Sequence, residues 1–182
     1  MDLLQLEREY YCGIDLHSKS MVVCVVSAEG KVVLTKRLEN RIDQLLVALK
    51  PFRQSIVLGV ESTFNWYWLV DGCREYALEI YLGHTYYMKA ISTSKTKNDR
   101  IDAKKIAHLL RAGFFPRAHA VEAKKRAIRD LVRQRNRLVY MRSELLAQTK
   151  TIYYQQGDLA KAGLSLRGRK TRENAAATIE LA

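Results

Sequence analysis

The first part of the chain is built from short apolar runs separated by polar breaks. Three runs, at residues 10–17, 20–27 and 31–38, are rich in β-branched side chains, and the break before the third contains Glu29 and Gly30. Runs of this length with tight connections are typical of strands that pair with their neighbours. We therefore predict a three-stranded antiparallel meander.

The spacing of apolar residues then changes to that of a helix over residues 41–52, with Asn40 placed to cap it. The apolar face of this helix is made of Ile42, Leu45, Leu46 and Leu49. A short unbroken apolar run at 55–62 suits a buried central strand. A Trp/Tyr-rich helical stretch at 64–76 and another strand at 77–83 follow.

This order, a meander followed by helix, strand, helix and strand, is that of a ribonuclease H-like domain, a mixed α/β sheet flanked by helices. The same order opens the actin-like domains of sugar kinases and chaperone ATPases. Because one fold supports many activities, the order of elements cannot choose between them, and a chemical site must do so.

A further helix is expected within residues 94–110, "SKTKNDRIDAKKIAHLL", and the pattern breaks at Pro116. Residues 121–156 then run without Gly or Pro and predict one long helix. Two apolar rows repeat along it every seven residues: Leu131, Leu138, Leu145 and Ile152, and beside them Val132, Val139, Leu146 and Tyr153. The rows favour a coiled coil or a helical hairpin that packs on a partner; a single helix folded back onto its own domain is the alternative.

The charge of the 182-residue chain is unevenly placed. It carries 31 Lys and Arg against 19 Asp and Glu; residues 1–83 hold 9 basic and 11 acidic side chains, and residues 84–156 hold 17 and 5. A positive field of this density favours a polyanion such as nucleic acid, because each neutralised phosphate releases counterions. A solvated surface tuned for solubility is the alternative. Nine basic residues decorate the long helix, among them Arg129, Arg133, Arg135 and Arg137.

Cysteine usage and hydropathy exclude other classes. Cys12, Cys24 and Cys73 lie far apart without metal-binding spacing and are expected to be small buried residues of a reduced protein. No apolar run approaches the roughly 20 residues that a membrane span needs, and no targeting leader opens the chain. We therefore expect a cytoplasmic protein without a membrane partner.

Two acidic residues occupy unusual positions. Asp15 lies inside an otherwise apolar strand, where an ionised carboxylate is costly unless it is paired or holds a metal. Glu61 lies at the carboxyl end of the central strand, the edge at which open α/β sheets place their ligands. If the two strands are adjacent, the two side chains can approach each other. Each also has a structural explanation, since Asp15 can pair with Lys19 across a turn and Glu61 can cap the next helix.

Asp99 and Asp102 lie three positions apart and so share a helix face. Alone, they are best explained as acids that favour the helix dipole in its first turn. With Asp15 and Glu61 they make a set of oxygen ligands suited to two divalent ions, Mg²⁺ or Mn²⁺, in phosphoryl transfer. The basic residues around them would hold the phosphate backbone: Lys95, Lys97, Arg100, Lys104 and Lys105.

The remaining candidate side chains receive structural interpretations. The four histidines are scattered, and only His17 lies beside a proposed ligand. Trp66, Tyr67 and Trp68 could stack on bases, but their helical spacing favours core packing or a subunit contact.

Three segments resemble, in this order, the amino-terminal DEDD domain of the insertion-sequence-110 transposases, relatives of the Piv-type DNA invertases: "YCGIDLHSKSMVVCVV", "GVESTFNWYWLVDG" and "KTKNDRIDAKKIAHLLRAG". The resemblance covers about residues 10–156. It implies a RuvC-like, ribonuclease H-fold catalytic domain. We accordingly divide the chain into such a domain at 1–120, a long basic coiled-coil helix at 121–156 and a flexible basic tail at 157–182.

The resemblance implies that Asp15, Glu61, Asp99 and Asp102 bind divalent metal and act in DNA strand cleavage and exchange. It also implies a structured guide RNA that pairs with target and donor DNA, and a homodimer or higher oligomer formed through the long helix. Family members carry a second, carboxyl-terminal domain with a nucleophilic serine, and no serine of this chain lies in a matching motif. We therefore expect an incomplete enzyme, either a fragment or a truncated relative.

Three other functions fit parts of the sequence. A self-sufficient RuvC-like junction nuclease would need no serine. A nucleotide-binding kinase or ATPase would need a second glycine-rich phosphate loop, and we find none. A non-catalytic nucleic-acid-binding module would use the four acids as helix caps and the basic helix for all of its binding.

Overall fold

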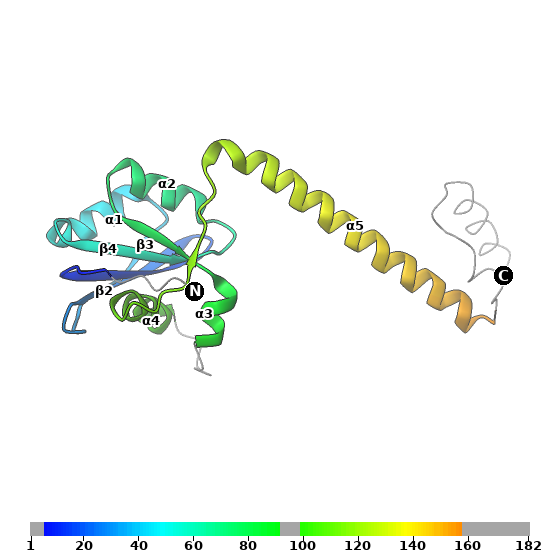
Figure 1. Ribbon diagram of the computed structural model, residues 1–182, viewed down its shortest axis with the longest axis horizontal. Helices are drawn as coiled ribbons and strands as arrows, with labels where there is room; N and C mark the ends of the chain where they lie inside the picture. Colours follow the sequence, from blue (N-terminus) through cyan, green and yellow to red (C-terminus); the bar gives the residue numbers. More distant parts are fainter. Residues whose placement is uncertain (1–5, 92–98, 158–182) are drawn as a thin grey trace. The chain divides into compact units, whose positions relative to one another are not determined.

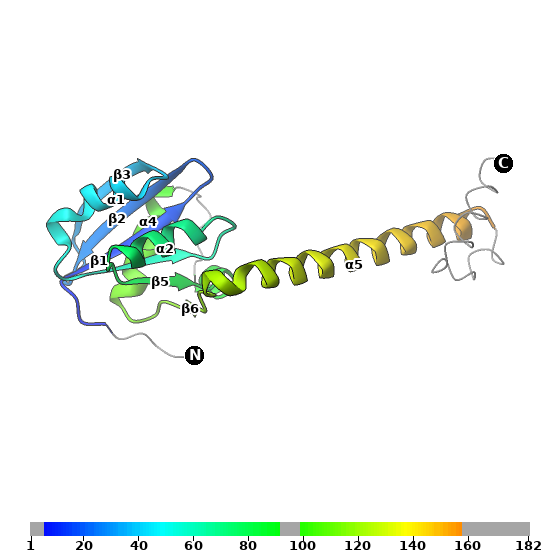
Figure 2. The same cartoon turned by 90° about the horizontal axis from the view of Figure 1, so that it is seen from above.

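The computed structural model describes residues 6–91 and 99–157. The chain divides into two units, with the boundary between Val121 and Glu122. The first unit holds a six-stranded mixed sheet in the order β3-β2-β1-β4-β5-β6 (Figure 1 and Figure 2). The strands are β1 (Tyr10–Leu16), β2 (Ser20–Ser27), β3 (Val32–Glu39), β4 (Ile56–Glu61), β5 (Ile80–Gly83) and β6 (Arg117–Ala118).

The pairing of the strands confirms the predicted meander. β1 pairs with β2 and β2 with β3, both antiparallel. β1 then pairs in parallel with β4, and β4 in parallel with β5, whereas the short β6 is antiparallel to β5. The carboxyl ends of β1, β4 and β5 therefore lie at one edge of the sheet, where open α/β sheets place their ligands.

Helices cover both faces of the sheet (Figure 1). One face carries α1 (Ile42–Leu49), which continues into a short 3₁₀ helix (Lys50–Phe52), and α2 (Tyr67–Glu75); the other carries α4 (Asp99–Arg111). The order of elements is the one predicted for a ribonuclease H-like domain. Two short elements were not predicted: α3 (Thr85–Ile91) has seven residues and β6 has two, too few to show a hydrophobic period.

The predicted cap of the first helix is wrong. Arg41 occupies the position before α1 and makes no capping hydrogen bond with its side chain. The Asn40 amide donates instead to the backbone carbonyl of His17, at 2.8 Å. Asn40 therefore ties the start of α1 to the loop between β1 and β2, which a reading of local sequence cannot show.

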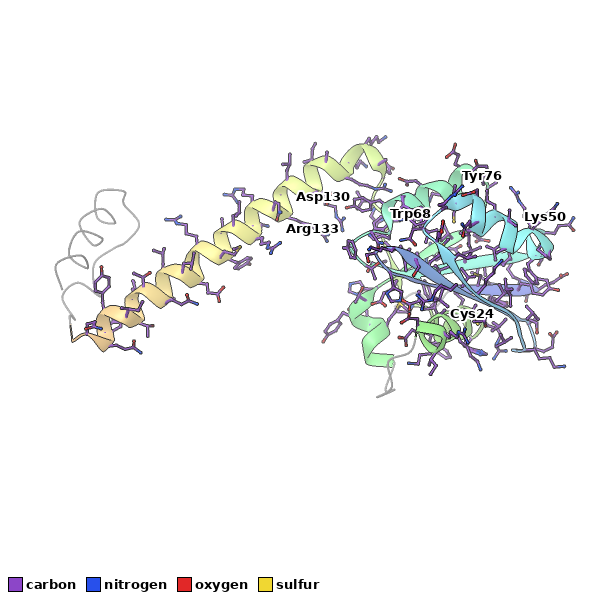
Figure 3. The ribbon with its side chains drawn as sticks, turned by 180° about the vertical axis from the view of Figure 1, so that it is seen from behind. Cys24, Lys50, Trp68, Tyr76, Asp130 and Arg133 are labelled. Atoms are coloured by element: carbon purple, nitrogen blue, oxygen red, sulfur yellow. The ribbon has the colours of Figure 1, made fainter. Side chains whose placement is uncertain are left out.

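The aromatic residues at the start of α2 pack on the core, as their spacing predicts. Trp66 is only 5% exposed, and Tyr67 and Trp68 are partly buried against the same apolar cluster. Trp68 is labelled in Figure 3. The observed helix begins at Tyr67 and not at residue 64, so it is shorter than the predicted one.

Alternate residues of the strands enter two separate cores. Ile14 of β1 lies in the core beneath α1 and α2, whereas Tyr11 lies in the core shared with α4. Cys24 of β2 belongs to the α4 side (Figure 3). The three cysteines are buried and free, as predicted, and burial raises the pKa of the Cys73 thiol to about 12. These thiols therefore stay protonated and act as small apolar side chains.

Two glycines allow α4 to lie directly on the central strands. Gly13 of β1 and Gly59 of β4 are paired in the parallel ladder. A Cβ atom at Gly13 would collide with the backbone carbonyl of Ala103 in α4, and a Cβ atom at Gly59 would come within 2.7 Å of the Leu110 side chain. The absence of side chains at this pair sets how close the helix comes to the sheet, and so where its first turn lies.

The second unit contains one uninterrupted helix, α5 (Ala123–Gln155), of 33 residues (Figure 1). The first apolar row predicted along it is exposed in the described chain, with Leu131 at 71% and Leu138 at 64%. Four basic residues named above also lie on it, and Arg133, Arg135 and Arg137 are exposed. The coiled coil itself stays a prediction.

The hydropathy of the helices bears on the membrane expectation. Across residues 6–91 and 99–157, no helix is both long enough and apolar enough to span a bilayer.

Candidate metal centre

Asp15 and Glu61 lie side by side at the carboxyl edge of the sheet. The register pairs Ile14 with Val60, the residues that directly precede the two acids. Each acid stands two positions after a glycine of the pair beneath α4, and side chains two apart in a strand point to the same face. Both carboxylates therefore stand on the α4 side of neighbouring strands, as the adjacency of the strands requires.

The first turn of α4 supplies Asp99 and Asp102. The helix is held on the sheet by a buried apolar face that includes Ala103, Ile106 and Leu110. Because that face rests on the glycine pair, the amino end of α4 is directed towards the edge where β1 ends. Two of the predicted phosphate-binding residues, Lys95 and Lys97, lie outside the described residues.

His17 connects acids from two elements. Its Nε2 atom lies 3.0 Å from Oδ2 of Asp15 and 3.3 Å from Oδ2 of Asp99. The three side chains can each offer one ligand atom, and these atoms all lie within 4.8 Å of one another. The Nε2 atom is buried, and in the described chain no acceptor is aligned with it for a hydrogen bond. The short distances thus describe close approach without a satisfied bond.

The backbone of His17 is held in place from two directions. Its carbonyl accepts hydrogen bonds from the Asn40 amide at 2.8 Å and from the Asn65 amide at 2.7 Å. Its N–H donates to the Ser20 carbonyl at 2.9 Å. These bonds fix the tight turn after β1, and so fix where the imidazole can reach.

Arg37 enters the site from the third strand. Asp15 is paired with Val22 across β1 and β2, and Val22 with Arg37 across β2 and β3. The guanidinium lies 2.5 Å from Oδ2 of Asp99 and also donates to Ser20 Oγ at 3.0 Å. A cation from the sheet therefore neutralises one of the helix acids.

A cleft of about 380 Å³ opens beside these groups. Asp15, Glu61, Asp102 and His17 line it, together with Lys105, whose Nζ lies 3.1 Å from Oδ1 of Asp102. Asp15 and His17 thus belong both to this cleft and to the close group that includes Asp99. The structure brings the four predicted acids to one end of the sheet, two from strands and two from a helix.

The site concentrates negative charge in a partly buried place. Burial raises the pKa of Asp15, the neighbouring carboxylates of Asp99 and Asp102 raise it further, and His17 opposes the rise. The pKa of Asp99 is lowered, chiefly by the hydrogen bond from Arg37. Asp15 is only 17% exposed, so its ionised form has little water to stabilise it.

These residues fit a divalent cation. Carboxylate oxygens are the ligands that Mg²⁺ and Mn²⁺ prefer, and a cation among them would offset the repulsion that raises the pKa of Asp15. The buried Nε2 of His17 offers a further lone pair or donor at the same point. In the described part of the chain, Asp15, His17 and Asp99 bring ligand atoms close enough together to share one ion.

The predicted phosphate-binding residues are placed unequally. Arg100 and Lys104 of α4 are exposed, whereas Lys105 is half-buried and engaged with Asp102. Sequence reasoning assigned no site role to Arg37 and noted His17 only as a neighbour of Asp15. His17 stands two positions after Asp15, and side chains two apart in a strand share a face, so the sequence held a sign that His17 lies near the site. No comparable sign in the sequence pointed to Arg37.

Comparison with known proteins gives structures and a family. RuvC of T. thermophilus in complex with a Holliday junction substrate is 14% identical, with a TM-score of 0.45, over 60% of this chain and 99% of that one. A second Thermus thermophilus RuvC structure is also 14% identical, with a TM-score of 0.44, over 60% of this chain and 99% of that one. The Pelota protein of Thermoplasma acidophilum is 13% identical, with a TM-score of 0.29, over 54% of this chain and 38% of that one. No curated protein sequence matches.

A family model described as a transposase of the insertion-sequence-110 DEDD type matches residues 12–153. That range is most of the chain, and it contains all four acids at the edge of the sheet. The protein therefore belongs to the DEDD transposase family of the insertion-sequence-110 type.

Proposed function

We propose that this chain is the metal-binding catalytic domain of a DNA transposase or site-specific recombinase, acting in strand cleavage and exchange. The observation that carries the proposal is that four carboxylates from β1, β4 and α4 stand at one end of the sheet: Asp15, Glu61 and Asp102 line one cleft, and Asp15 also lies in a close group with Asp99. Membership of a transposase family supports DNA as the substrate. The proposed catalytic unit is residues 1–120, followed by a long basic helix at 121–156 and a tail at 157–182.

The four acids would share the work of holding the ion. Divalent Mg²⁺ or Mn²⁺ bound there would supply activation of an attacking oxygen and stabilisation of charge on the transferred phosphoryl group. Asp15 is fixed by burial in β1, and Asp99 lies against His17 and is paired with Arg37, a partner that the ion would share or replace. Arg100 and Lys104, exposed on α4, would contact the phosphates of the strand.

An ion-pair scaffold is the competing interpretation. Asp99 already pairs with Arg37, and Asp102 with Lys105, so half of the acids are neutralised without a metal. Asp15 and Glu61, the two acids on the strands, are not neutralised by a lysine or an arginine in the described structure. Within the described residues, the Glu61 side chain has no cationic partner, and Asp15 has only His17. The unbalanced charge at the strand ends favours a bound cation over a purely structural role.

A melting experiment tests the metal site. Binding of Mn²⁺ or Mg²⁺ to the native state alone raises stability by about 2.7 kcal/mol when the ion is at 100 times its Kd. We expect wild-type protein to show that rise, and Asp15→Asn and Asp102→Asn to lose it. Asp43→Asn is the matched control, because Asp43 is an exposed acid on α1, away from the cleft, and is paired with Arg41. An equal rise in all of these proteins would refute the site.

Nucleic-acid cutting separates the catalytic alternatives. Metal-dependent cleavage of branched DNA by this chain alone would favour the self-sufficient junction nuclease over a domain that needs a partner. Binding that ignores divalent ions and tolerates all four acid-to-asparagine changes would favour the non-catalytic module.

The partners of the domain are also proposals. The exposed arginines of α5 and the basic excess after residue 84 support binding of a structured guide RNA as well as DNA. The exposed apolar row of α5 supports a homodimer or higher oligomer through that helix. Competition between a folded RNA and unstructured RNA of equal length tests the first point, since a charge-only surface would not prefer the folded RNA.

A further inference from the structure

A second cavity, of about 630 Å³, lies at the edge of the sheet formed by β5 and β6. Its polar and aromatic lining comes from Arg74, Tyr81, Tyr87, Arg117 and His119. None of the described residues that line it also lines the cleft of the metal centre. It is therefore a separate site, and the proposed strand chemistry does not use it.

The short final strand leaves this edge open. β6 pairs only with Leu82 and Gly83, so the first half of β5 has no strand beside it on that side in the described chain. Ile80, Leu82 and Ala118 give the cavity an apolar floor. A planar ligand can bury one of its faces against such apolar side chains.

Arg117 is held over the ring of Tyr81. Its guanidinium carbon lies 4.5 Å from the ring centroid, a distance typical of a cation–π contact. The Tyr81 hydroxyl donates to Glu79 at 2.6 Å, and Glu79 is also bound by Arg8 at 2.8 Å. The Glu79 carboxylate is thus engaged by Tyr81 and Arg8, and Arg117 is positioned by the Tyr81 ring.

The lining is cationic without compensating acids. Arg74 and Arg117 have no carboxylate partner among the described residues, and neither Asp nor Glu lines the cavity there. His119 adds a further potential donor. Guanidinium groups that lack carboxylates, beside an apolar floor, suit a ligand with both a phosphate and a planar ring.

Tyr87 supplies an exposed ring at this cavity. It is 49% exposed and lies 4.8 Å from His84 and 5.6 Å from Tyr86, measured between ring centroids. The next residue, Met88, lines the metal cleft. Neighbouring positions on α3 therefore face the two separate sites, so a strand that crosses α3 can reach both.

We propose that this cavity binds one unpaired nucleotide of the nucleic acid that occupies the metal cleft, with its base stacked on Tyr87 and its phosphate on Arg117 and Arg74. The inference rests on the proposed function for the identity of the ligand. An acidic peptide would satisfy the arginines and leave the aromatic ring and the apolar floor unused. A cavity of this volume accommodates a nucleotide.

Fluorescence of a 20-nucleotide DNA strand that contains 2-aminopurine tests the proposal, in EDTA so that no strand is cut. Stacking quenches this base, and base–aromatic stacking contributes enough to change affinity roughly tenfold. We expect Tyr87→Ala to weaken binding about tenfold and to relieve the quenching. Arg117→Gln should weaken binding and lower the salt dependence by about one phosphate contact.

Two variants serve as matched controls. Tyr86→Ala removes an exposed tyrosine one position away that does not line the cavity, and Arg53→Gln removes an exposed arginine elsewhere on the domain. Both should bind the strand like wild-type protein. Because Tyr87 and Arg117 are surface residues, their variants are expected to melt within a few degrees of wild type, which circular dichroism checks.

The outcomes separate this inference from the proposed function. Unchanged affinity and quenching in Tyr87→Ala, or equal losses in Tyr86→Ala, would overturn the nucleotide site. If Asp15→Asn still loses its metal-induced rise in melting temperature, the metal centre stands without it. Stronger competition by a poly-glutamate peptide than by the DNA strand would also overturn the inference, in favour of a protein partner.

Discussion

Gly13 and Gly59 are paired on adjacent parallel strands beneath the same helix, α4. Two residues further along each strand stand Asp15 and Glu61. The glycines bring the helix close, and the acids at the strand ends then meet the first turn of that helix. The packing of the core and the assembly of the candidate site are therefore one structural arrangement.

Gly13→Ala tests that relationship. The new Cβ would meet the backbone of Ala103 and Ala107, and a helix backbone cannot move aside as a side chain can. Overpacking costs roughly 1–3 kcal/mol, and a clash with backbone atoms lies towards the upper end of that range. We expect a clear fall in urea midpoint and loss of the Mn²⁺-induced rise in melting temperature, since α4 must shift.

Gly72→Ala is the control for the glycine prediction. Its Cβ would come within 3.1 Å of the Ile42 side chain, whose end can rotate, and alanine favours the helix in which this position lies. Its stability is expected to stay within about 1 kcal/mol of wild type. Similar stabilities of the two alanine variants would show that α4 is not held by close approach at Gly13.

Arg37→Gln tests competition between the cation of the sheet and the metal. Arg37 lowers the pKa of Asp99 by a hydrogen bond, so the metal must share or replace this partner. The pair is exposed and contributes at most about 1 kcal/mol to stability. We expect little change in melting without metal and a roughly fivefold lower Mn²⁺ midpoint, measured by titration of the melting temperature.

The control for this variant is Arg41→Gln, which removes an exposed arginine from an ion pair with Asp43, away from the cleft. Its metal midpoint should equal that of wild type. Weaker metal binding in Arg37→Gln would reverse the interpretation, because Arg37 would then be needed to position Asp99 for the ion.

The acids could be predicted from sequence because each stands at a position with a physical signature. Asp15 interrupts an apolar strand, Glu61 ends one, and two further acids share a helix face. Arg37 could not be found in this way. Its approach depends on the pairing of Asp15 with Val22 and of Val22 with Arg37, and such registers are set by long-range pairing.

Local rules also failed where a tertiary partner competed. Asn40 is a good capping residue, yet its amide reaches the His17 carbonyl instead. The bond joins residues 23 positions apart, so a local window contains no sign of it. The same bond helps to orient His17. The residue wrongly predicted as a helix cap therefore supports a residue of the candidate site.

His108 gives a prediction about pH. Its pKa is lowered from 6.5, first by burial and then by Arg111 and Lys104. The unfolded chain therefore binds a proton more readily, and stability present above about pH 6.5 is lost as pH falls from that value through the folded pKa. We expect His108→Gln to lose less melting temperature than wild type when the pH falls from about 7.5 to about 5.5, which is roughly the range over which histidine titrates.

His119→Gln serves as the comparison, because His119 is exposed on the segment after β6. Its pH profile should follow that of wild type. A His108→Gln profile parallel to wild type over the whole range would mean that carboxylates alone set the acid sensitivity.

Leu138→Glu tests the proposed association through α5. Leu138 is 64% exposed and lies in the row spaced by seven residues, where knobs of one helix enter holes of another. A buried glutamate at such a seam is costly, so we expect the variant to sediment as a monomer at concentrations where wild type is dimeric. Tyr140→Glu is the control, since Tyr140 is 76% exposed and lies outside both rows. A wild-type monomer, or equal dissociation by both substitutions, would contradict association along this row, whereas loss in Leu138→Glu alone would place the contact on it.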